Sequence, residues 1–261
     1  MGKEVVIVFR WYIIKSIKRT IKFKKGTTVA EHGYQQYCGA ARALDVVGDR
    51  WTLLIVRELM LGPRRFTDLL DGLPGISRNL LTERLRTLGR DGVITRAELP
   101  PPAARQVYEL TEDGRDLANA MIPLVAWGAT RLGARKSDET FRAHWAALAM
   151  NAFADRQAAS GVRENYQYEV GGKPFYFTVA DGAIELHGGR APNPVVTLTT
   201  DDDTWADMAS GATTASAAAR RGKLTLVGDR QAAKRMARIF SRATVLAQAE
   251  QIVNAAKSPM A

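Results

Sequence analysis

Residues 76–90 constrain the fold most, because they predict one short amphipathic helix with a defined start. Ser77 is a good N-cap residue, since its hydroxyl can accept a hydrogen bond from a free backbone N–H of the first turn. Leu81, Leu85 and Leu88 recur at helical spacing and predict one buried face. The stretch therefore indicates a helix that packs on a small core through its leucines.

The opposite face of this helix is polar. It carries Asn79, Thr82, Glu83, Arg86 and Arg90. Amides, hydroxyls and guanidinium groups are those that bond phosphates and base edges. Taken alone, the helix has two interpretations: a DNA recognition helix, or a surface helix with a solvated arginine face.

Two further helices are predicted before it. Residues 51–61 are almost wholly apolar, which is typical of a helix buried at the centre of a domain. Residues 66–70 predict a short helix with Thr67 as its cap, and Gly72 to Gly75 predict a tight connection into residues 76–90. Two short helices joined by a Gly-containing turn match the helix-turn-helix unit.

A hairpin is predicted after the helix-turn-helix. Residues 93–99 and 105–110 are strand candidates, and the proline-rich loop between them cannot enter a sheet. A hairpin in this position is a wing, with Arg96 and Arg105 flanking its tip, where they can meet a phosphate or the minor groove. The alternative is a surface hairpin with two solvated arginines.

The next predicted helix has more apolar surface than a small domain needs. Thr111 and the acidic residues after it predict its start, since acids favour a helix N-terminus. Leu117, Met121, Leu124 and Trp127 continue it to about residue 133. Exposed apolar surface usually marks an interface, so we expect a second copy of the chain there.

Residues 34–133 resemble the HxlR family of winged-helix transcriptional regulators. The resemblance lies in residues 37–38, 43–59, 62–66, 75–77, 81–85, 92–94 and 108–114. It implies a dimer that binds a near-palindromic operator on double-stranded DNA and favours the recognition-helix interpretation. The chain departs from the family at Gly39, where a proline is common after the cysteine. The predicted DNA-binding residues are Arg65, Ser77, Arg78, Asn79, Thr82, Arg86, Arg96 and Arg105. Arg84, on the flank of the leucine face, is expected to be structural.

The single cysteine, Cys38, excludes an internal disulfide and fits a reducing cytosol. Two interpretations stay open for it: a thiol packed beside a helix, or a redox-sensing thiol of the kind found in some members of the family. Three histidines leave no cluster with metal-ligand spacing, and no catalytic motif is present. We expect a cytoplasmic protein that is no enzyme and holds no metal or other cofactor.

Residues 1–28 differ from the rest of the chain. They contain six of the eleven lysines and no alanine, and they carry +7 of the net charge of +10. Their apolar run is too short for a membrane helix, and they lack the charged, then apolar, then small-residue order of a signal peptide. Three interpretations remain: a basic interfacial helix, a basic arm on DNA, or an extension that is not native.

A second domain is predicted after residues 134–138, which are a plausible linker. A helix over 140–159 precedes strand candidates at 164–170, 173–180, 183–186 and 195–199, with Gly-rich breaks typical of hairpins. Short helices, a strand at 224–229 and helices at 231–240 and 243–256 follow. This order predicts an antiparallel sheet covered by helices on one face.

Residues 140–241 resemble the sterol carrier protein type-2-like domain. The resemblance lies in residues 172–175, 195–201 and 222–229. It implies an apolar tunnel for a lipid-like ligand. By residue type, the candidates to line it are Phe175, Phe177, Trp205, Met208, Met236 and Phe240. The alternative is plain core packing.

The sequence thus predicts an α+β protein with four parts: a basic extension (1–28), a winged helix-turn-helix domain (29–133), a linker (134–138) and a sterol-carrier-like domain (139–261). The leading hypothesis is a transcriptional regulator that binds operator DNA as a dimer and is modulated by an apolar ligand. It does not require a membrane. The alternatives are a lipid carrier whose winged domain serves protein association, or a thiol-redox repressor acting through Cys38.

Overall fold

The computed structural model describes residues 33–99, 105–132, 136 and 138–240. The chain falls into two compact units, residues 1–48 and 49–261, and each is taken by itself. The predicted extension at 1–28, the tip of the predicted wing and the helix predicted at 243–256 lie outside the described residues. The predicted domain boundaries stay a prediction.

The described part of the first unit contains helix α2 (Gly39–Val47). The Asp45 carboxylate organises the residues before it, because it accepts a hydrogen bond from the Tyr34 backbone N–H at 2.9 Å and pairs with Arg42 at 3.2 Å. The helix ends at Val47, and Gly48 is its C-cap.

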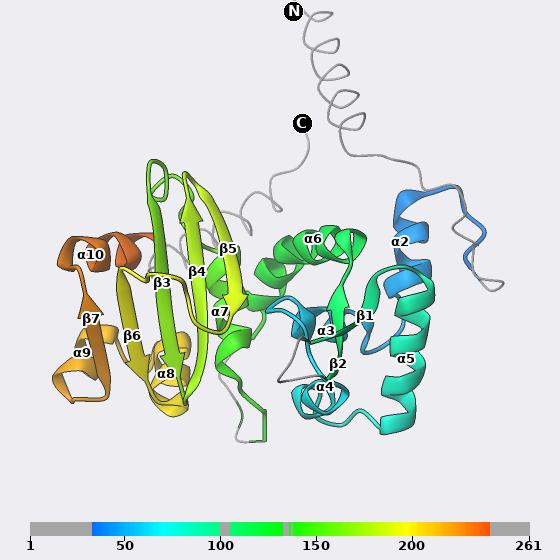
Figure 1. Cartoon of the computed structure of the whole chain (residues 1–261), viewed down its shortest axis with the longest axis horizontal. Coiled ribbons are helices and arrows are strands. Elements are labelled where there is room, and N and C mark those ends of the chain that lie inside the picture. Colours follow the sequence, from blue (N-terminus) through cyan, green and yellow to red (C-terminus); the bar gives the residue numbers. More distant parts are fainter. Residues whose placement is uncertain (1–32, 100–104, 133–135, 137, 241–261) are drawn as a thin grey trace, which may run out of the picture. The chain divides into compact units, whose positions relative to one another are not determined.

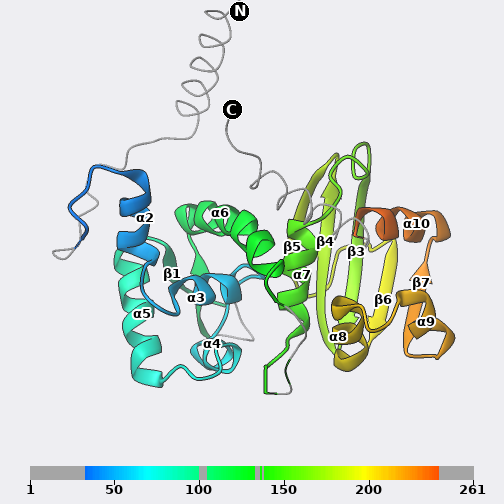
Figure 2. The ribbon, with the colours of Figure 1, turned by 180° about the vertical axis from the view of Figure 1, so that it is seen from behind.

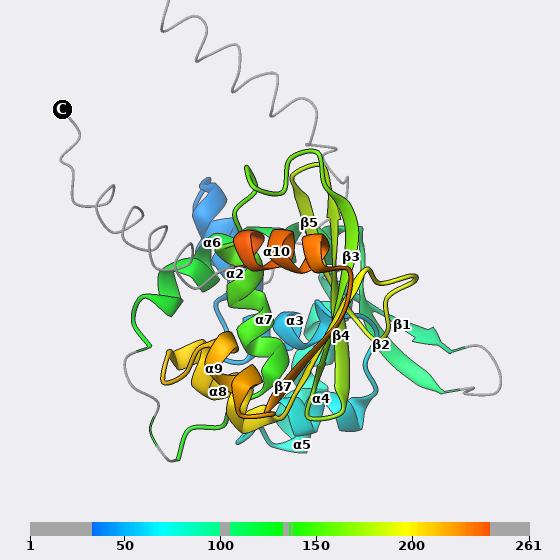
Figure 3. The ribbon, with the colours of Figure 1, turned by 90° about the vertical axis from the view of Figure 1, so that its left-hand side faces the viewer.

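The second unit begins with the winged helix-turn-helix. Its elements are α3 (Thr52–Leu59), α4 (Phe66–Gly72), α5 (Arg78–Arg90), β1 (Ile94–Glu98), β2 (Gln106–Leu110) and α6 (Glu112–Ala129). The Ser77 hydroxyl accepts from the Leu80 N–H at 3.2 Å, and the three leucines of α5 are buried, as the sequence predicted. Strands β1 and β2 pair in antiparallel fashion as the wing hairpin (Figure 3).

Two predicted helix ends are wrong. The N-cap of α4 is Arg65 rather than Thr67, because the Asp68 carboxylate reaches back and accepts from the Arg65 backbone N–H at 3.1 Å. Helix α6 ends at Ala129, before the predicted residue 133. Its start is as predicted, since the Thr111 hydroxyl accepts from the Gly114 N–H.

The rest of the second unit is a five-stranded sheet with helices. Its elements are α7 (Ala143–Ala152), β3 (Arg163–Val170), β4 (Lys173–Ala180), β5 (Ala183–Gly188), β6 (Val196–Thr200), α8 (Asp202–Ser210), α9 (Ala215–Arg220), β7 (Leu224–Gly228) and α10 (Arg230–Ile239). The strand order is β5-β4-β3-β6-β7 (Figure 1). The pairs β3–β4, β4–β5 and β6–β7 are antiparallel, as predicted, whereas β3 and β6 pair in parallel, which corrects the predicted antiparallel sheet at this one place.

The parallel pair arises from the segment at residues 189–195. After the β3-β4-β5 meander this segment crosses the open face of the sheet and enters β6 beside β3 (Figure 1). The Gln167 side chain holds it, because its Oε1 accepts from the Ala191 N–H at 2.7 Å. Asn165 Nδ2 also donates to the Pro192 carbonyl at 2.7 Å. The crossing explains why Gln167 is only 3% exposed on the face away from the helices.

Helices α7, α8 and α10 lie on one face of this sheet (Figure 2). The core between them is aromatic: the rings of Tyr168 and Phe175 stack at 5.1 Å, and Trp205 from α8 meets both edge-on. Helix α7 is shorter than the predicted 140–159, because the chain turns after it and the Asp155 N–H donates to the Ile239 carbonyl at the end of α10. Among the described residues, no helix is long and apolar enough to cross a membrane.

Candidate nucleic-acid interface

Helix α5 presents the polar face that the sequence predicted. Arg78, Asn79, Thr82 and Arg86 are all exposed, while the leucines of the opposite face are buried. The Thr82 hydroxyl donates to the Arg78 carbonyl at 2.9 Å, so it is oriented along the helix. Two guanidinium groups, an amide and a hydroxyl therefore share one solvent-facing surface, with Ser77 at its start.

Arg84 differs from its neighbours on α5. Its side chain is 17% exposed, and its Nη1 lies 2.7 Å from the Asp49 carboxylate before α3. This ion pair joins α5 to the start of the central helix. Arg84 is therefore structural, as its place on the flank of the leucine face indicated.

The other predicted DNA-binding arginines lie at the start of α4 and on the wing. Arg65 is exposed and its Nε donates to Asp68 at 3.1 Å. The Arg96 guanidinium lies 5.6 Å from the centre of the Tyr108 ring, and Arg105 is exposed just before β2. DNA contact by these three arginines stays a prediction.

A backbone link fixes the wing to the helix-turn-helix. The Arg64 N–H donates to the Tyr108 carbonyl at 2.9 Å, and the Tyr108 N–H donates back to the Arg64 carbonyl at 2.8 Å. This two-bond bridge ties the segment before α4 to strand β2. The wing and the helix-turn-helix therefore share one rigid backbone connection.

Sequence reasoning missed a buried carboxylate on α3. Glu58 is 3% exposed, and its oxygens accept from Arg57 Nη2 at 2.8 Å and from the Trp145 indole N–H at 2.8 Å. His144 Nε2 lies 2.9 Å from its second oxygen. Burial alone raises the pKa of the Glu58 carboxyl, but His144, Arg57 and the Trp145 N–H outweigh it and lower that pKa. A glutamate within the apolar run at 51–61 was the one sequence signal for it.

The six candidates for lining an apolar site lie together in the sheet domain. Phe175, Phe177, Trp205, Met236 and Phe240 are buried in one core cluster, and Met208 packs against it. The rings of Phe177 and Phe240 lie 4.5 Å apart. Their proximity agrees with both interpretations, so the lining role stays a prediction.

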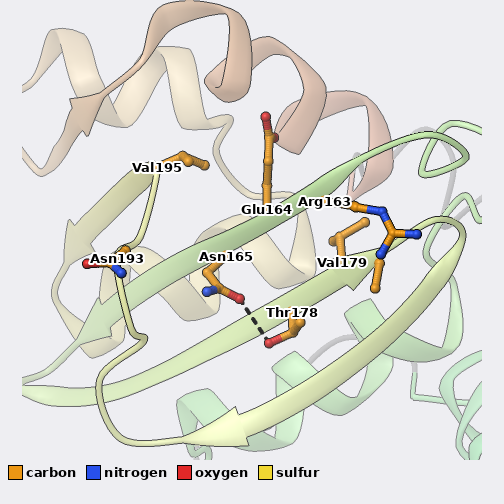
Figure 4. A pocket seen from close by; sticks show the side chains of 8 residues that line it. Arg163, Glu164, Asn165, Thr178, Val179, Asn193 and Val195 are labelled. Carbon is orange, nitrogen blue, oxygen red and sulfur yellow. Dashed lines mark hydrogen bonds between the residues drawn. The ribbon is translucent and has the colours of Figure 1, made fainter.

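A hollow of about 280 Å³ lies between β3, β4 and the segment that precedes β6 (Figure 4). It is open to solvent and has a mixed lining that includes Val179 and Val195, and within it Thr178 Oγ1 donates to Asn165 Oδ1 at 3.0 Å. Its described lining residues include none of the six apolar candidates. The hollow is therefore a surface feature distinct from the predicted tunnel.

Cys38 is exposed at the start of α2, so the interpretation as a packed thiol is wrong. Hydrogen bonds from the backbone N–H groups of Ala41 and Ala40 lower the pKa of its thiol. A lowered pKa and exposure are the two properties that a reactive cysteine needs.

Comparison with known proteins agrees with this geometry. The model of the HxlR-like helix-turn-helix matches residues 46–136. YodB, an HTH-type transcriptional regulator of Bacillus subtilis, is 36% identical over 85 residues, which are 33% of this chain and 76% of that protein. This chain belongs to the HxlR-like helix-turn-helix family.

Other relatives cover the same part of the chain. An uncharacterized HTH-type transcriptional regulator of Mycobacterium tuberculosis is 48% identical over 87 residues, which are 33% of this chain. The match spans about half (54%) of that relative's length. A crystal structure of diamide-treated YodB is 34% identical, with a TM-score of 0.31, and the match covers 36% of this chain and 93% of that one.

A second family model matches the sheet domain. The model of the SCP-2 sterol transfer family covers residues 146–241. The chain thus joins an HxlR-like helix-turn-helix to an SCP-2-like domain, which confirms both resemblances read from the sequence.

Proposed function

We propose that this protein is a transcriptional regulator that binds operator DNA as a dimer through α5 and is modulated by an apolar ligand of the SCP-2-like domain. One observation carries the DNA-binding part: a capped helix with a buried leucine face exposes Arg78, Asn79, Thr82 and Arg86 together. The wing supplies a second cationic contact. Relatives named HTH-type transcriptional regulators support the same role.

The substitution Arg86→Ala tests α5 as the DNA reader. We expect operator affinity to fall about tenfold and the slope of log affinity against log salt to decrease by about 1, since one phosphate or base contact is lost. The measurement is fluorescence anisotropy with DNA from immediately upstream of the protein's own gene, over a salt series.

Arg84→Ala is the matched control, because it removes the same side chain two positions earlier where it pairs with Asp49. It is expected to lower the free energy of unfolding by about 1 kcal/mol and to leave the salt slope unchanged. Equal slopes for wild type and Arg86→Ala would show that α5 is not the reader.

The apolar stripe of α6 supports the dimer. Leu124 and Trp127 are 46% and 52% exposed on one side of the helix, although other apolar residues of α6, among them Met121, are buried. The Arg131 guanidinium lies 3.7 Å from the centre of the Trp127 ring. Large apolar side chains left in solvent on a helix favour a partner, and a two-fold dimer would present two α5 helices to successive turns of DNA.

We expect Trp127→Glu to make the protein monomeric and to weaken operator binding, because a buried charge without a partner opposes association. Light scattering after size exclusion measures the mass. Leu226→Glu is the control, since Leu226 is 45% exposed on β7 and lies outside this stripe. If the Trp127→Glu protein were still a dimer and bound the operator with wild-type affinity, the dimer interface would lie elsewhere.

The ligand part of the proposal concerns the aromatic core of the sheet domain. We expect a fluorescent fatty acid, cis-parinaric acid, to bind saturably and to change operator affinity. Met208→Trp should reduce uptake, because the larger side chain fills space beside the cluster. Met150→Trp is the matched control, since Met150 also packs partly buried against the cluster but is not a lining candidate.

Two results would contradict parts of this proposal. If cis-parinaric acid does not bind saturably, the ligand part of the proposal is wrong. Saturable binding without any sequence-specific DNA shift would favour the lipid carrier, whose winged domain serves protein association.

A thiol-redox repressor is the second candidate function, and it is favoured by the exposure of Cys38 and by the backbone hydrogen bonds that lower the pKa of its thiol. We expect the rate of thiol alkylation to reach half its maximum at a lower pH than for free cysteine, because the thiolate is the nucleophile. Diamide treatment should release wild-type protein from DNA and leave Cys38→Ser bound. Release of Cys38→Ser to the same extent would exclude the thiol, since the chain has no other cysteine.

A further inference from the structure

The helix-turn-helix meets the sheet domain at one buried polar cluster within the second unit. It consists of Arg57 and Glu58 on α3 with Arg142, His144 and Trp145 at the start of α7. The Glu58 side chain is 4% exposed, and those of Arg57 and His144 are both 17% exposed. We call these five residues the junction cluster.

The junction cluster is built around aligned donors. Glu58 Oε1 accepts from Arg57 and from the Trp145 indole, and Oε2 lies 2.9 Å from His144. The Arg57 guanidinium lies 4.1 Å from the centre of the Trp145 ring, a cation–π contact. Since a buried carboxylate without donors is costly, α7 has to keep its place for the cluster to persist.

The cluster also contacts the end of α4, which leads into α5. Arg142 Nη2 donates to the Asp71 carbonyl, and Arg57 Nη2 lies 3.4 Å from the Gly72 carbonyl. A Cβ at Gly72 would lie 2.6 Å from Glu58 Oε2, so α4 and the carboxylate are in close contact. The residues after Gly72 are the turn that precedes α5, with Leu73 and Ile76 buried.

Two contacts beside the cluster connect α7 and the end of α3 to the sheet domain. The Trp205 indole donates to the Ala143 carbonyl at 3.2 Å, at the start of α7. The Gly188 N–H at the end of β5 donates to the Leu61 carbonyl at 2.9 Å, just after α3. Helix α7 therefore lies between the aromatic core and the turn before α5.

We propose that His144, Trp145 and Arg142 of α7 are positioning residues for the recognition helix: through Glu58 and the carbonyls at the end of α4 they hold the turn that orients α5. The proposal rests on the proposed function for its effect on DNA. It makes the sheet domain a determinant of operator affinity without contact to DNA. A ligand that moved α7 would change that affinity by the same route.

Glu58→Gln and Trp145→Phe test this. The first keeps the shape of the side chain and removes its charge. The second removes the indole N–H and one of the two fused rings, and leaves an aromatic side chain beside Arg57. We expect each to weaken operator affinity roughly fivefold or more. The salt slope should stay that of wild type, because no phosphate contact is lost.

Glu164→Gln is the matched control. Glu164 also accepts from an arginine and from an aromatic side chain, Arg235 and Tyr166, but this cluster joins β3 to α10 and does not touch α3 or α4. It is expected to lower the stability of the sheet domain and to leave operator affinity unchanged.

Amide hydrogen exchange of the full chain supplies a second readout that needs no DNA. Both junction variants should exchange faster at residues 71–81 than wild type, whereas Glu164→Gln should not. Wild-type exchange there in both junction variants would overturn the proposal. If the variants exchange faster but the wild-type protein itself does not bind operator DNA, the positioning role is supported and the proposed function is rejected. The two failures are therefore distinguishable.

Discussion

The buried carboxylate of Glu58 is the interaction on which the arrangement of the second unit depends. A buried carboxylate needs several hydrogen-bond or charge partners to offset the loss of water. Here they come from two separate parts of the chain: Arg57 on α3, and His144 and Trp145 on α7. Removing any donor leaves the charge less compensated, which costs more than an ordinary surface ion pair. The carboxylate therefore fixes α7 against the centre of the helix-turn-helix.

The helix-turn-helix is likewise a packed framework, and it exposes the polar face of α5. Three leucines bury one face of α5, Arg84 pairs with Asp49, and the Arg64–Tyr108 bridge fixes the wing. These contacts leave Arg78, Asn79, Thr82 and Arg86 free to face solvent. In the proposed positioning role, a change at the end of α4 would reach α5 through the turn at residues 73–77.

The sheet domain depends on the segment that connects β5 to β6. Its β3-β4-β5 meander needs a return segment to bring β6 beside β3, and that segment lies across the open face. Gln167 satisfies the backbone of this segment with its Oε1 and donates from Nε2 to the Phe175 carbonyl at 2.9 Å. The opposite face carries the aromatic cluster under α7, α8 and α10, so the two faces have separate roles.

Local pattern determined the elements of the winged domain, the N-caps of α5 and α6 and the polar face of α5, because helix periodicity, Ser77 and Thr111 act over a few residues. It also placed the strands of the sheet domain closely. It misplaced the cap of α4, where Asp68 reaches back to Arg65, and it missed the parallel β3–β6 pair. Strand order and the partners of Glu58 depend on residues as far apart as Glu58 and Trp145. Only tertiary structure decides such contacts, because a single buried charge does not indicate along the chain which donors will surround it.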